Sequence, residues 1–301
     1  MYLVTGASGF IGKELLKSNC KFKSLYRISA CDKVEPYYCI DELDGNTQYG
    51  NAFDGVEAII HLAGLAHSKS YSHKEYRKVN VEGTLNIAKQ AAVAGVKRFV
   101  FVSSIGVHGF SLNGKITEQS QVSPHNEYAK SKYDAELGLS EISKETGLEV
   151  VIVRPTLVYG FNAPGNFGLL TSLISRFPLL PFGMVHNRRD FISVQNLSDL
   201  LITCAKHPKA AGHTFLASEG ETVSTKEFAN AIAGGLNKTI IQLPVPVKLM
   251  KFVARVTGRS TMVEQLVGNF EVDSSHAKNI LDWQPPYTMK ESMKTLIAKN
   301  K

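Results

Sequence analysis

Short apolar runs alternate with longer amphipathic stretches through the first half of the chain. The apolar runs are candidate strands at 2–5, 22–28, 38–40, 56–62, 97–103 and 149–154. Apolar residues at helical spacing cover 10–18, 47–53, 72–94 and 126–146. The strand segments are apolar almost throughout, as parallel strands are when helices cover both faces of their sheet. The alternation predicts an α/β fold with a doubly wound, Rossmann-like parallel sheet.

A glycine-rich turn, Gly6-Ala7-Ser8-Gly9-Phe10-Ile11-Gly12, follows the first predicted strand directly. Gly6 allows the tight turn, Gly9 lets the backbone approach a pyrophosphate, and Gly12 lets the next helix pack on the sheet. The N–H groups at the start of that helix then face the phosphates. Since the turn stands between a strand and a helix, it predicts a dinucleotide site. The cofactor-binding residues expected here are Gly6, Ser8, Gly9, Phe10, Ile11 and Gly12.

The second half of the chain has a looser pattern, richer in Pro, Gly and Asn and with shorter elements. Helices are predicted at 166–176, 196–206, 225–236, 247–256 and 287–299. We therefore expect a cofactor-binding domain at 1–160, with 190–215 returning to its sheet. A smaller C-terminal lobe at 161–189 and 216–301 is expected to bind the substrate.

Composition and charge exclude several classes of protein. The chain of 301 residues is 44% hydrophobic and 20% charged, as in ordinary globular proteins. Its net charge of +7 would suit nucleic acid, but the basic residues are dispersed and do not alternate with aromatic ones, so we expect an anionic small-molecule substrate instead. The longest apolar stretch, 169–185, is interrupted by Arg176, Pro178 and Pro181, so no membrane span is expected.

The cysteines and the start of the chain bear on the compartment. The four cysteines form no CxxC pair, and no other metal-ligand spacing occurs. The first predicted strand begins at residue 2, which leaves no room for a signal peptide. We expect a reduced, cytoplasmic protein without a metal.

Tyr128 and Lys132 stand four residues apart, on one face of the helix predicted at 126–146. Ser104 follows the strand predicted at 97–103, which brings a hydroxyl to the same edge of the sheet. A hydride transfer at a carbinol carbon needs a group that exchanges a proton with the oxygen, and a free tyrosine titrates near about 10. Lys132 and an oxidised nicotinamide would lower the pKa of Tyr128, while Ser104 orients the substrate oxygen. The alternative is a solvated helix face without a catalytic role.

With these motifs in this order, the chain resembles extended short-chain dehydrogenases/reductases of the nucleotide-sugar epimerase/dehydratase type over nearly its whole length. The matching landmarks are Gly6–Gly12, His61-Leu62-Ala63-Gly64, Asn80-Val81-Glu82-Gly83-Thr84, Phe101–Gly109, Tyr128–Lys132, Arg154–Gly160 and Arg189-Asp190-Phe191-Ile192. The resemblance implies that Leu62, Ala63 and Gly64 border the cofactor. It further implies that Asn80 supports the active site, that Lys132 holds the nicotinamide ribose and that Pro155 flanks the nicotinamide. Arg189 and Asn166 are then expected to bind the diphosphate of a UDP-sugar.

The choice between NAD and NADP rests on the end of the second predicted strand. Arg27 stands there, where NAD-binding members of the family usually carry an aspartate for the ribose 2′-hydroxyl. An arginine suits a 2′-phosphate and favours NADP, whereas Asp32, about twenty residues after Gly12, keeps NAD open. The alternative is that Arg27 is merely exposed to solvent.

Two departures from the family pattern bear on the reaction. Family dehydratases carry Thr-Asp-Glu where this chain has Ser104-Ile105-Gly106, so dehydration is not expected. Many epimerases carry a second phosphate-binding arginine just before the equivalent of Asp273, and Val272 does not supply it. Its candidate replacements are Lys248, Lys251, Arg255 and Arg259. The alternative is that these four residues form the solvent-exposed face of an amphipathic helix.

The segments at 165–167, 187–191 and 281–286 resemble bacterial polysaccharide enzymes that reduce UDP-4-keto-6-deoxy-N-acetylglucosamine to UDP-N-acetylquinovosamine. The leading hypothesis is therefore an NAD(P)-dependent 4-keto reductase of surface-polysaccharide synthesis, in which Tyr128 protonates the oxygen at C4. The alternative is a 4-epimerase of UDP-N-acetylglucosamine or UDP-glucose, which uses the same residues twice. A hypothesis of another class, a non-catalytic nucleotide-binding regulator, is disfavoured by the complete set of Ser104, Tyr128 and Lys132.

The resemblance also implies a homodimer that forms through the long helices at 72–94 and 126–146. Three histidines, His67, His108 and His125, are expected near the mouth of the site, and none is assigned a catalytic role. Trp283 is expected to lie in the core rather than to stack on uracil.

Overall fold

The computed structural model describes residues 1–29, 34–66, 71–109 and 114–297, and the side chain of Thr261 is not described. In this part of the chain, seven parallel strands form the central sheet in the order β10-β6-β5-β4-β1-β2-β3. They are β1 (Tyr2–Thr5), β2 (Phe22–Arg27), β3 (Tyr37–Ile40), β4 (Ala58–His61), β5 (Arg98–Val102), β6 (Glu149–Pro155) and β10 (Thr214–Ala217). The predicted α/β class and the parallel sheet are confirmed.

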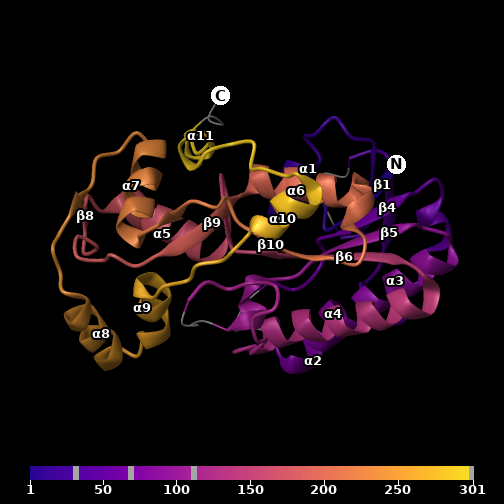
Figure 1. The fold of residues 1–301 in the computed structure, drawn as a ribbon, viewed down its shortest axis with the longest axis horizontal. Helices are drawn as coiled ribbons and strands as arrows, with labels where there is room; N and C mark the ends of the chain where they lie inside the picture. Colours follow the sequence, from indigo (N-terminus) through magenta and orange to yellow (C-terminus); the bar gives the residue numbers. More distant parts are fainter. Residues whose placement is uncertain (30–33, 67–70, 110–113, 298–301) are drawn as a thin grey trace.

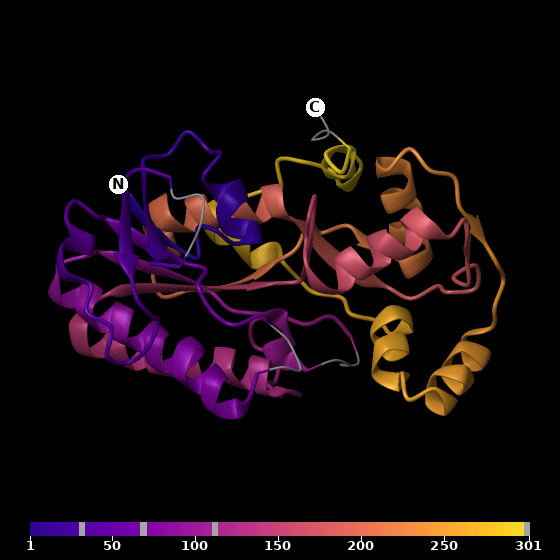
Figure 2. The same ribbon diagram turned by 180° about the vertical axis from the view of Figure 1, so that it is seen from behind.

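Helices cover both faces of this sheet, as Figure 1 shows from the side and Figure 2 from behind. One face carries α1 (Phe10–Leu15), α6 (Val194–Lys206) and α10 (Ser275–Leu281), and the other α2 (His73–Tyr76), α3 (Thr84–Val93) and α4 (Glu127–Thr146). Phe215 and Leu200 are fully buried between the sheet and the first set of helices. Phe99 and Leu139 are fully buried between the sheet and the second set. Burial on both faces is why the strands are apolar almost throughout.

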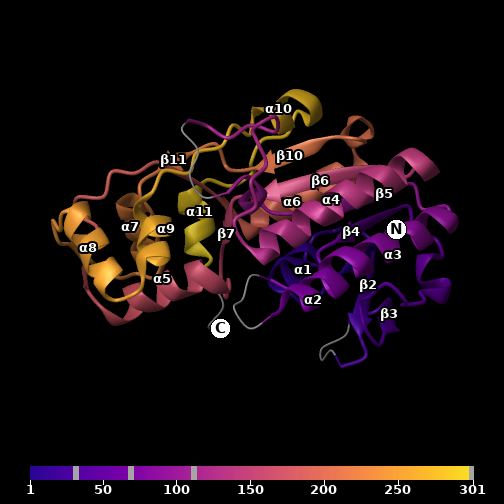
Figure 3. The ribbon, with the colours of Figure 1, turned by 90° about the horizontal axis from the view of Figure 1, so that it is seen from below.

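The smaller lobe lies beyond the carboxyl ends of the parallel strands, and Figure 3 shows it beside the sheet edge. It contains a three-stranded sheet of β7 (Leu157–Tyr159), β9 (Arg189–Ser193) and β11 (Thr222–Val223), and the pair β8 (Leu179–Leu180) and β12 (Ile241–Gln242). Its helices are α5 (Gly165–Arg176), α7 (Thr225–Gly235), α8 (Val247–Val256), α9 (Ser260–Val267) and α11 (Met289–Lys294). Buried aromatic residues such as Tyr159, Phe167 and Phe228 form its core.

Three predicted helices differ in the structure. Within 47–53 only a 3₁₀ turn forms at Gly50–Phe53, because Gly50 has a φ of +45° and Asn51 leaves the helical region. The helix expected at 72–94 is divided into α2, a π-helical segment at Arg77–Gly83 and α3. The helix expected at 287–299 is shorter in the structure, where it is α11. It begins after the N-cap residue Thr288, which forms a capping box with Glu291.

The segment that returns to the main sheet as a strand is also shorter than the expected 190–215. Residues 214–217 form the edge strand β10 beside β6, but 190–193 belong to β9 in the small sheet. In contrast, α10 lies in the stretch assigned to the lobe and packs on the main sheet, in the same core cluster as α6 and β10. Trp283 is a core residue, 7% exposed, and its Nε1 donates to Asp199 at 2.8 Å.

Candidate functional site

The glycine turn has the shape that a dinucleotide requires. Gly6 has a φ of +69°, and Gly9 N donates to its carbonyl oxygen at 2.9 Å. A Cβ on Gly12 would collide with that carbonyl and would lie 2.6 Å from Ala7 Cα. Ser8 and Gly9 are exposed, so the backbone before α1 is accessible to a phosphate. The residues therefore fit a pyrophosphate.

The two apolar residues of the turn face opposite ways. Phe10 packs with the core of the smaller lobe, near Gly160. Ile11 packs with the core under the main sheet. Both side chains thus anchor the turn, and contact with a cofactor there would fall to the backbone.

Replacing Gly12 with alanine should destabilise the protein and weaken dinucleotide binding. The added methyl meets backbone atoms, which cannot rotate away, so we expect a loss of about 2–3 kcal/mol in the free energy of unfolding. Gly234→Ala, in α7, is the matched control, because a Cβ there meets nothing within 4 Å. We expect it to stabilise the protein by up to about 1 kcal/mol. Equal urea midpoints for the two variants would contradict the packing argument.

The loop after β4 lies against this turn. A Cβ on Gly6 would come within 2.8 Å of Ala63 N, which donates to Thr5 Oγ1 at 3.1 Å. The ring of His61 bridges Thr5 Oγ1 at 2.9 Å and Thr84 Oγ1 at 3.0 Å. Burial, with the nearby charge of Lys132, lowers the pKa of His61 to about 3, so its ring is neutral at physiological pH. Leu62, Ala63 and Gly64 therefore follow β4 beside the glycine turn, and the hydrogen bonds of His61 hold the end of β4 in place.

Asn80 holds the rest of that loop. It is fully buried in the π-helical segment, and its Oδ1 accepts from Leu65 N at 2.7 Å. Its Nδ2 donates to Leu65 O at 3.1 Å and to Ser131 Oγ at 3.0 Å. A Cβ on Gly64 would lie 2.9 Å from Asn80 Oδ1 and 3.5 Å from Lys132 Nζ. Asn80 therefore ties the loop after β4 to the helix that carries Lys132.

Lys132 is buried beneath this loop. Its Nζ donates to Val102 O at 3.0 Å and lies 4.7 Å from the ring centroid of Phe101. Burial lowers the pKa of Lys132 to about 8, and the charge of Glu136 opposes that shift. The side chain remains a cation at neutral pH.

Tyr128 and Ser104 meet at the mouth of the site. Burial and the neighbouring Tyr76 raise the pKa of Tyr128 to about 12, although a hydrogen bond from Ser104 lowers it. We expected Lys132 to lower this pKa, but in the structure burial of the phenol dominates. The side chain of Tyr128 is therefore a neutral phenol that can donate a proton.

A buried polar network lies directly behind these residues. Arg154 donates to Glu136 through Nε at 3.0 Å and through Nη2 at 2.5 Å. Ser103 Oγ donates to the same carboxylate, and Arg154 Nη1 lies 2.9 Å from His108 Nε2. All four side chains are at most 6% exposed. The network fixes β5 and β6 to α4 next to Ser104 and Pro155.

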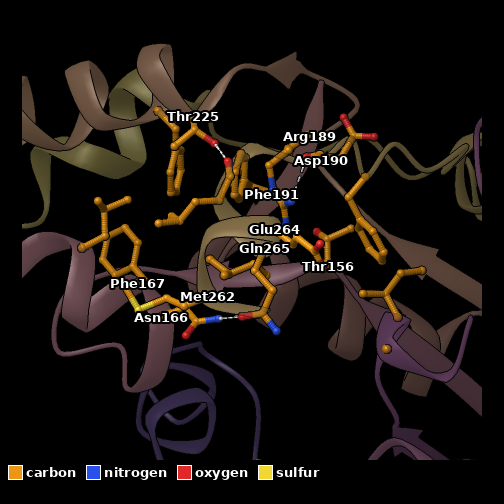
Figure 4. Close-up of a pocket in the computed structure, with 18 of the residues that line it drawn as sticks. Thr156, Asn166, Phe167, Arg189, Asp190, Phe191, Thr225, Met262, Glu264 and Gln265 are labelled. Atoms are coloured by element: carbon orange, nitrogen blue, oxygen red, sulfur yellow. Dashed lines mark hydrogen bonds between the residues drawn. The ribbon is translucent and has the colours of Figure 1, made fainter. Parts of the chain in front are cut away.

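A cavity of about 730 Å³ opens between the sheet edge and the smaller lobe. Its lining brings together residues that are far apart in the sequence, as Figure 4 shows for part of the wall. The predicted residues in the wall are Ser104, Tyr128, Pro155, Asn166 and Arg189. The four predicted substrate-binding residues thus share one cavity.

Arg189 places a positive charge in the part of the cavity wall that the smaller lobe provides. Its Nη1 donates to Gly268 O at 3.1 Å, and its guanidinium lies 5.7 Å from the ring centroid of Phe270. Burial lowers its pKa to about 10, so it stays charged. Its neighbour Asp190 is buried and accepts from Thr222 Oγ1 at 2.7 Å and Val272 N at 2.6 Å. These bonds hold β9, and therefore Arg189, in place.

The helices α8 and α9 supply wall residues that sequence reasoning missed or left open. Asn166 Nδ2 donates to Gln265 Oε1 at 3.2 Å, and Glu264 and Met262 lie beside that contact (Figure 4). Of the four basic candidates for a second phosphate ligand, Lys251 lines the cavity. No local motif marks these residues, because only the fold brings α9 to α5 across about a hundred residues.

Of the remaining candidates, one lines this cavity, and the others lie outside it or outside the described residues. Arg27 ends β2 and is exposed, and Asp32 and His67 fall in segments that the structure does not describe. His108 is buried in the network, whereas His125 lines the cavity. In the described ranges, no cluster of His, Cys, Asp and Glu is arranged to hold a metal. Across the same ranges, no helix has the length and apolar character of a membrane span.

Comparisons with known proteins agree with this geometry. A family model described as the NAD dependent epimerase/dehydratase family matches residues 2–217. A Vibrio cholerae protein described as UDP-glucose 4-epimerase is 38% identical over 304 residues, which cover 97% of this chain and 93% of the relative. Bacillus cereus UDP-N-acetylglucosamine 4-epimerase has a TM-score of 0.74 at 20% identity and covers 100% of this chain and 99% of its own. The Bordetella bronchiseptica enzyme WbmG, solved with NAD and UDP, has a TM-score of 0.74 at 21% identity and covers 99% and 93%.

Proposed function

The chain belongs to the NAD-dependent epimerase/dehydratase family, and from that premise we propose that it is a UDP-sugar 4-epimerase. Its substrate would be UDP-N-acetylglucosamine or UDP-glucose. The observation that carries this proposal is the single cavity that Ser104, Tyr128 and Arg189 share. A proton-exchanging pair and a guanidinium in the wall of one cavity suit a sugar joined to a diphosphate. The likeness to the Vibrio cholerae relative favours epimerisation over the 4-keto reduction that the sequence suggested first.

The enzyme uses an NAD(P) cofactor. The exposed backbone of Ser8 and Gly9 would hold its pyrophosphate, and Ala63 and Gly64 would border it. Lys132 would hold the nicotinamide ribose, Pro155 would flank the ring, and Arg27 would meet a 2′-phosphate if NADP is bound. When bound, the oxidised cofactor supplies the hydride acceptor for C4 and a positive charge that lowers the pKa of Tyr128.

The residues of the chain handle the proton at the oxygen on C4. Tyr128, deprotonated once the bound cofactor has lowered its pKa, takes this proton as the carbon is oxidised to a ketone, and returns it when the hydride is delivered to the opposite face. Ser104 holds the same oxygen by a hydrogen bond. Arg189, with Lys251 as the candidate second cation, retains the diphosphate while the keto sugar rotates.

We further propose that residues 1–160 with 190–215 bind the cofactor, and that 161–189 with 216–301 bind the sugar nucleotide. A homodimer through α3 and α4 is proposed on the resemblance alone. The described cysteines, Cys20, Cys39 and Cys204, are free thiols. They suit a reducing compartment, and we place the reaction in the cytoplasm.

One experiment separates the two reactions. The nucleotide released from the purified protein is identified, and the protein is then incubated with UDP-N-acetylglucosamine or UDP-glucose while the C4 epimer is followed. We expect bound NAD, product without added cofactor and no net change in nicotinamide absorbance. Stoichiometric oxidation of added NADPH or NADH by UDP-4-keto-6-deoxy-N-acetylglucosamine, with no epimer formed, would establish the reductase instead.

A further inference from the structure

Helix α8 leaves an apolar stripe in solvent. The helix lies with α9 at the end of the lobe farthest from the main sheet, as Figures 1 and 3 show. Leu249, Phe252, Val253 and Val256 are 51%, 62%, 50% and 73% exposed. Their spacing of i, i+3, i+4 and i+7 places them on one face. Ala254 is the buried residue of this helix.

A basic stripe runs beside the apolar one. Lys248, Lys251 and Arg255 follow a spacing of i, i+3 and i+7, and Arg259 comes just after the helix. All four are exposed. Residues 228–263 contain these four and Lys238 but no Asp or Glu, although the chain has 27 acidic residues. The surface made by α8 therefore joins exposed apolar groups to positive charge that no acidic residue of that stretch offsets.

Neither a solvated helix face nor a second copy of the chain accounts for this surface. A helix with a merely solvated polar face buries its apolar face, whereas here both are exposed. A two-fold contact through α8 would bring the basic stripe of one copy close to the basic stripe of the other. Like charges at such a contact repel each other.

We propose that α8 docks on the surface of an anionic lipid bilayer. Phe252, Leu249 and Val256 would enter the region between headgroups and acyl chains. Lys248, Arg255 and Arg259 of the basic stripe would pair with lipid phosphates. Helices that lie in a membrane interface have this arrangement, with Lys and Arg on one face and Phe and Leu on the other. The attachment is peripheral and reversible, since α8 has only ten residues and lies in the plane of the surface.

Docking would also orient the active site. Lys251 belongs to the basic stripe and lines the cavity, and Met262 of α9, half exposed, lines the same cavity. The wall of the cavity therefore includes residues that border the docking face. On a bilayer, the enzyme would take up its substrate and release its product at the membrane surface.

The test is sedimentation of the purified full chain with vesicles. We expect binding to vesicles that contain phosphatidylglycerol and not to vesicles of phosphatidylcholine alone, with binding reduced by salt. Phe252→Asp should weaken binding about tenfold or more, because it removes a buried aromatic group and adds a negative charge. Lys248→Ala and Arg255→Ala should each weaken it about fivefold.

The control is Tyr287→Asp, which makes the same change from an exposed aromatic residue to aspartate just before α11, a helix that lies apart from α8 (Figure 1). Tyr287 is 49% exposed. This variant should bind vesicles as the unaltered chain does. Phe252→Asp and the control should epimerise soluble UDP-sugar normally without vesicles, so failure of docking is distinguishable from failure of the proposed reaction. Absence of binding to anionic vesicles, or equal binding by Phe252→Asp, would overturn the proposal. A loss of self-association in Phe252→Asp, with vesicle binding intact, would identify α8 as a contact between copies instead.

Discussion

Replacing Tyr128 with phenylalanine should lower kcat for epimerisation by about a thousandfold, within the usual range for loss of a general acid–base group. The phenol oxygen is hydrogen-bonded to Ser104 at the cavity, so it can exchange a proton with the substrate oxygen that Ser104 would hold. Phenylalanine preserves the ring and its packing, including the contact with Tyr76 at a centroid distance of 6.2 Å. The measurement is kcat and KM on the UDP-sugar, with bound cofactor quantified in each preparation.

The matched control is Tyr133→Phe, five residues further along α4, where the side chain is half-buried. It removes the same hydroxyl from the same helix and should leave kcat within a factor of about two. Cofactor content should be unchanged in both variants. If Tyr128→Phe turned over normally, Tyr128 would not be the proton donor, and the non-catalytic hypothesis would gain support.

Replacing Glu136 with alanine should cost about 3–5 kcal/mol in the free energy of unfolding, because it leaves the guanidinium of Arg154 charged and unpaired in the interior. Arg154 is 6% exposed and Glu136 is 3% exposed, so water cannot replace the lost partner. The change also removes the acceptor of Ser103 Oγ, next to Ser104. Urea unfolding at fixed pH, followed by circular dichroism, measures the loss.

A double replacement separates the penalty of the unpaired charge from the value of the pair. Glu136→Leu with Arg154→Met removes both charges and should recover most of the stability lost in Glu136→Ala. Glu141→Ala breaks an exposed pair with Lys144 on the same helix and should hardly change the midpoint. A Glu136→Ala variant as stable as Glu141→Ala would show that the buried pair contributes nothing.

Local patterns were sufficient to predict the elements around the expected cofactor site. The glycine turn, the apolar strands and the Tyr128–Lys132 spacing all depend on neighbours within one turn or one strand, so the sequence exposes them directly. The family resemblance drawn from the same landmarks is confirmed by the match over residues 2–217. The prediction of a helix at 47–53 was wrong, because the positive φ at Gly50 overrides a weak helical pattern.

The sequence by itself thus determined the α/β class, the glycine turn and four of the polar residues that meet at the cavity, Ser104, Tyr128, Asn166 and Arg189. Only the tertiary structure decided how they act. It raised the pKa of Tyr128 by burial, paired Glu136 with Arg154, and brought Gln265 to Asn166. It also left the apolar stripe of α8 in solvent, although that stripe has the pattern of a buried helix face. Burial and long-range contact arise from the packing of distant segments, which no local spacing specifies.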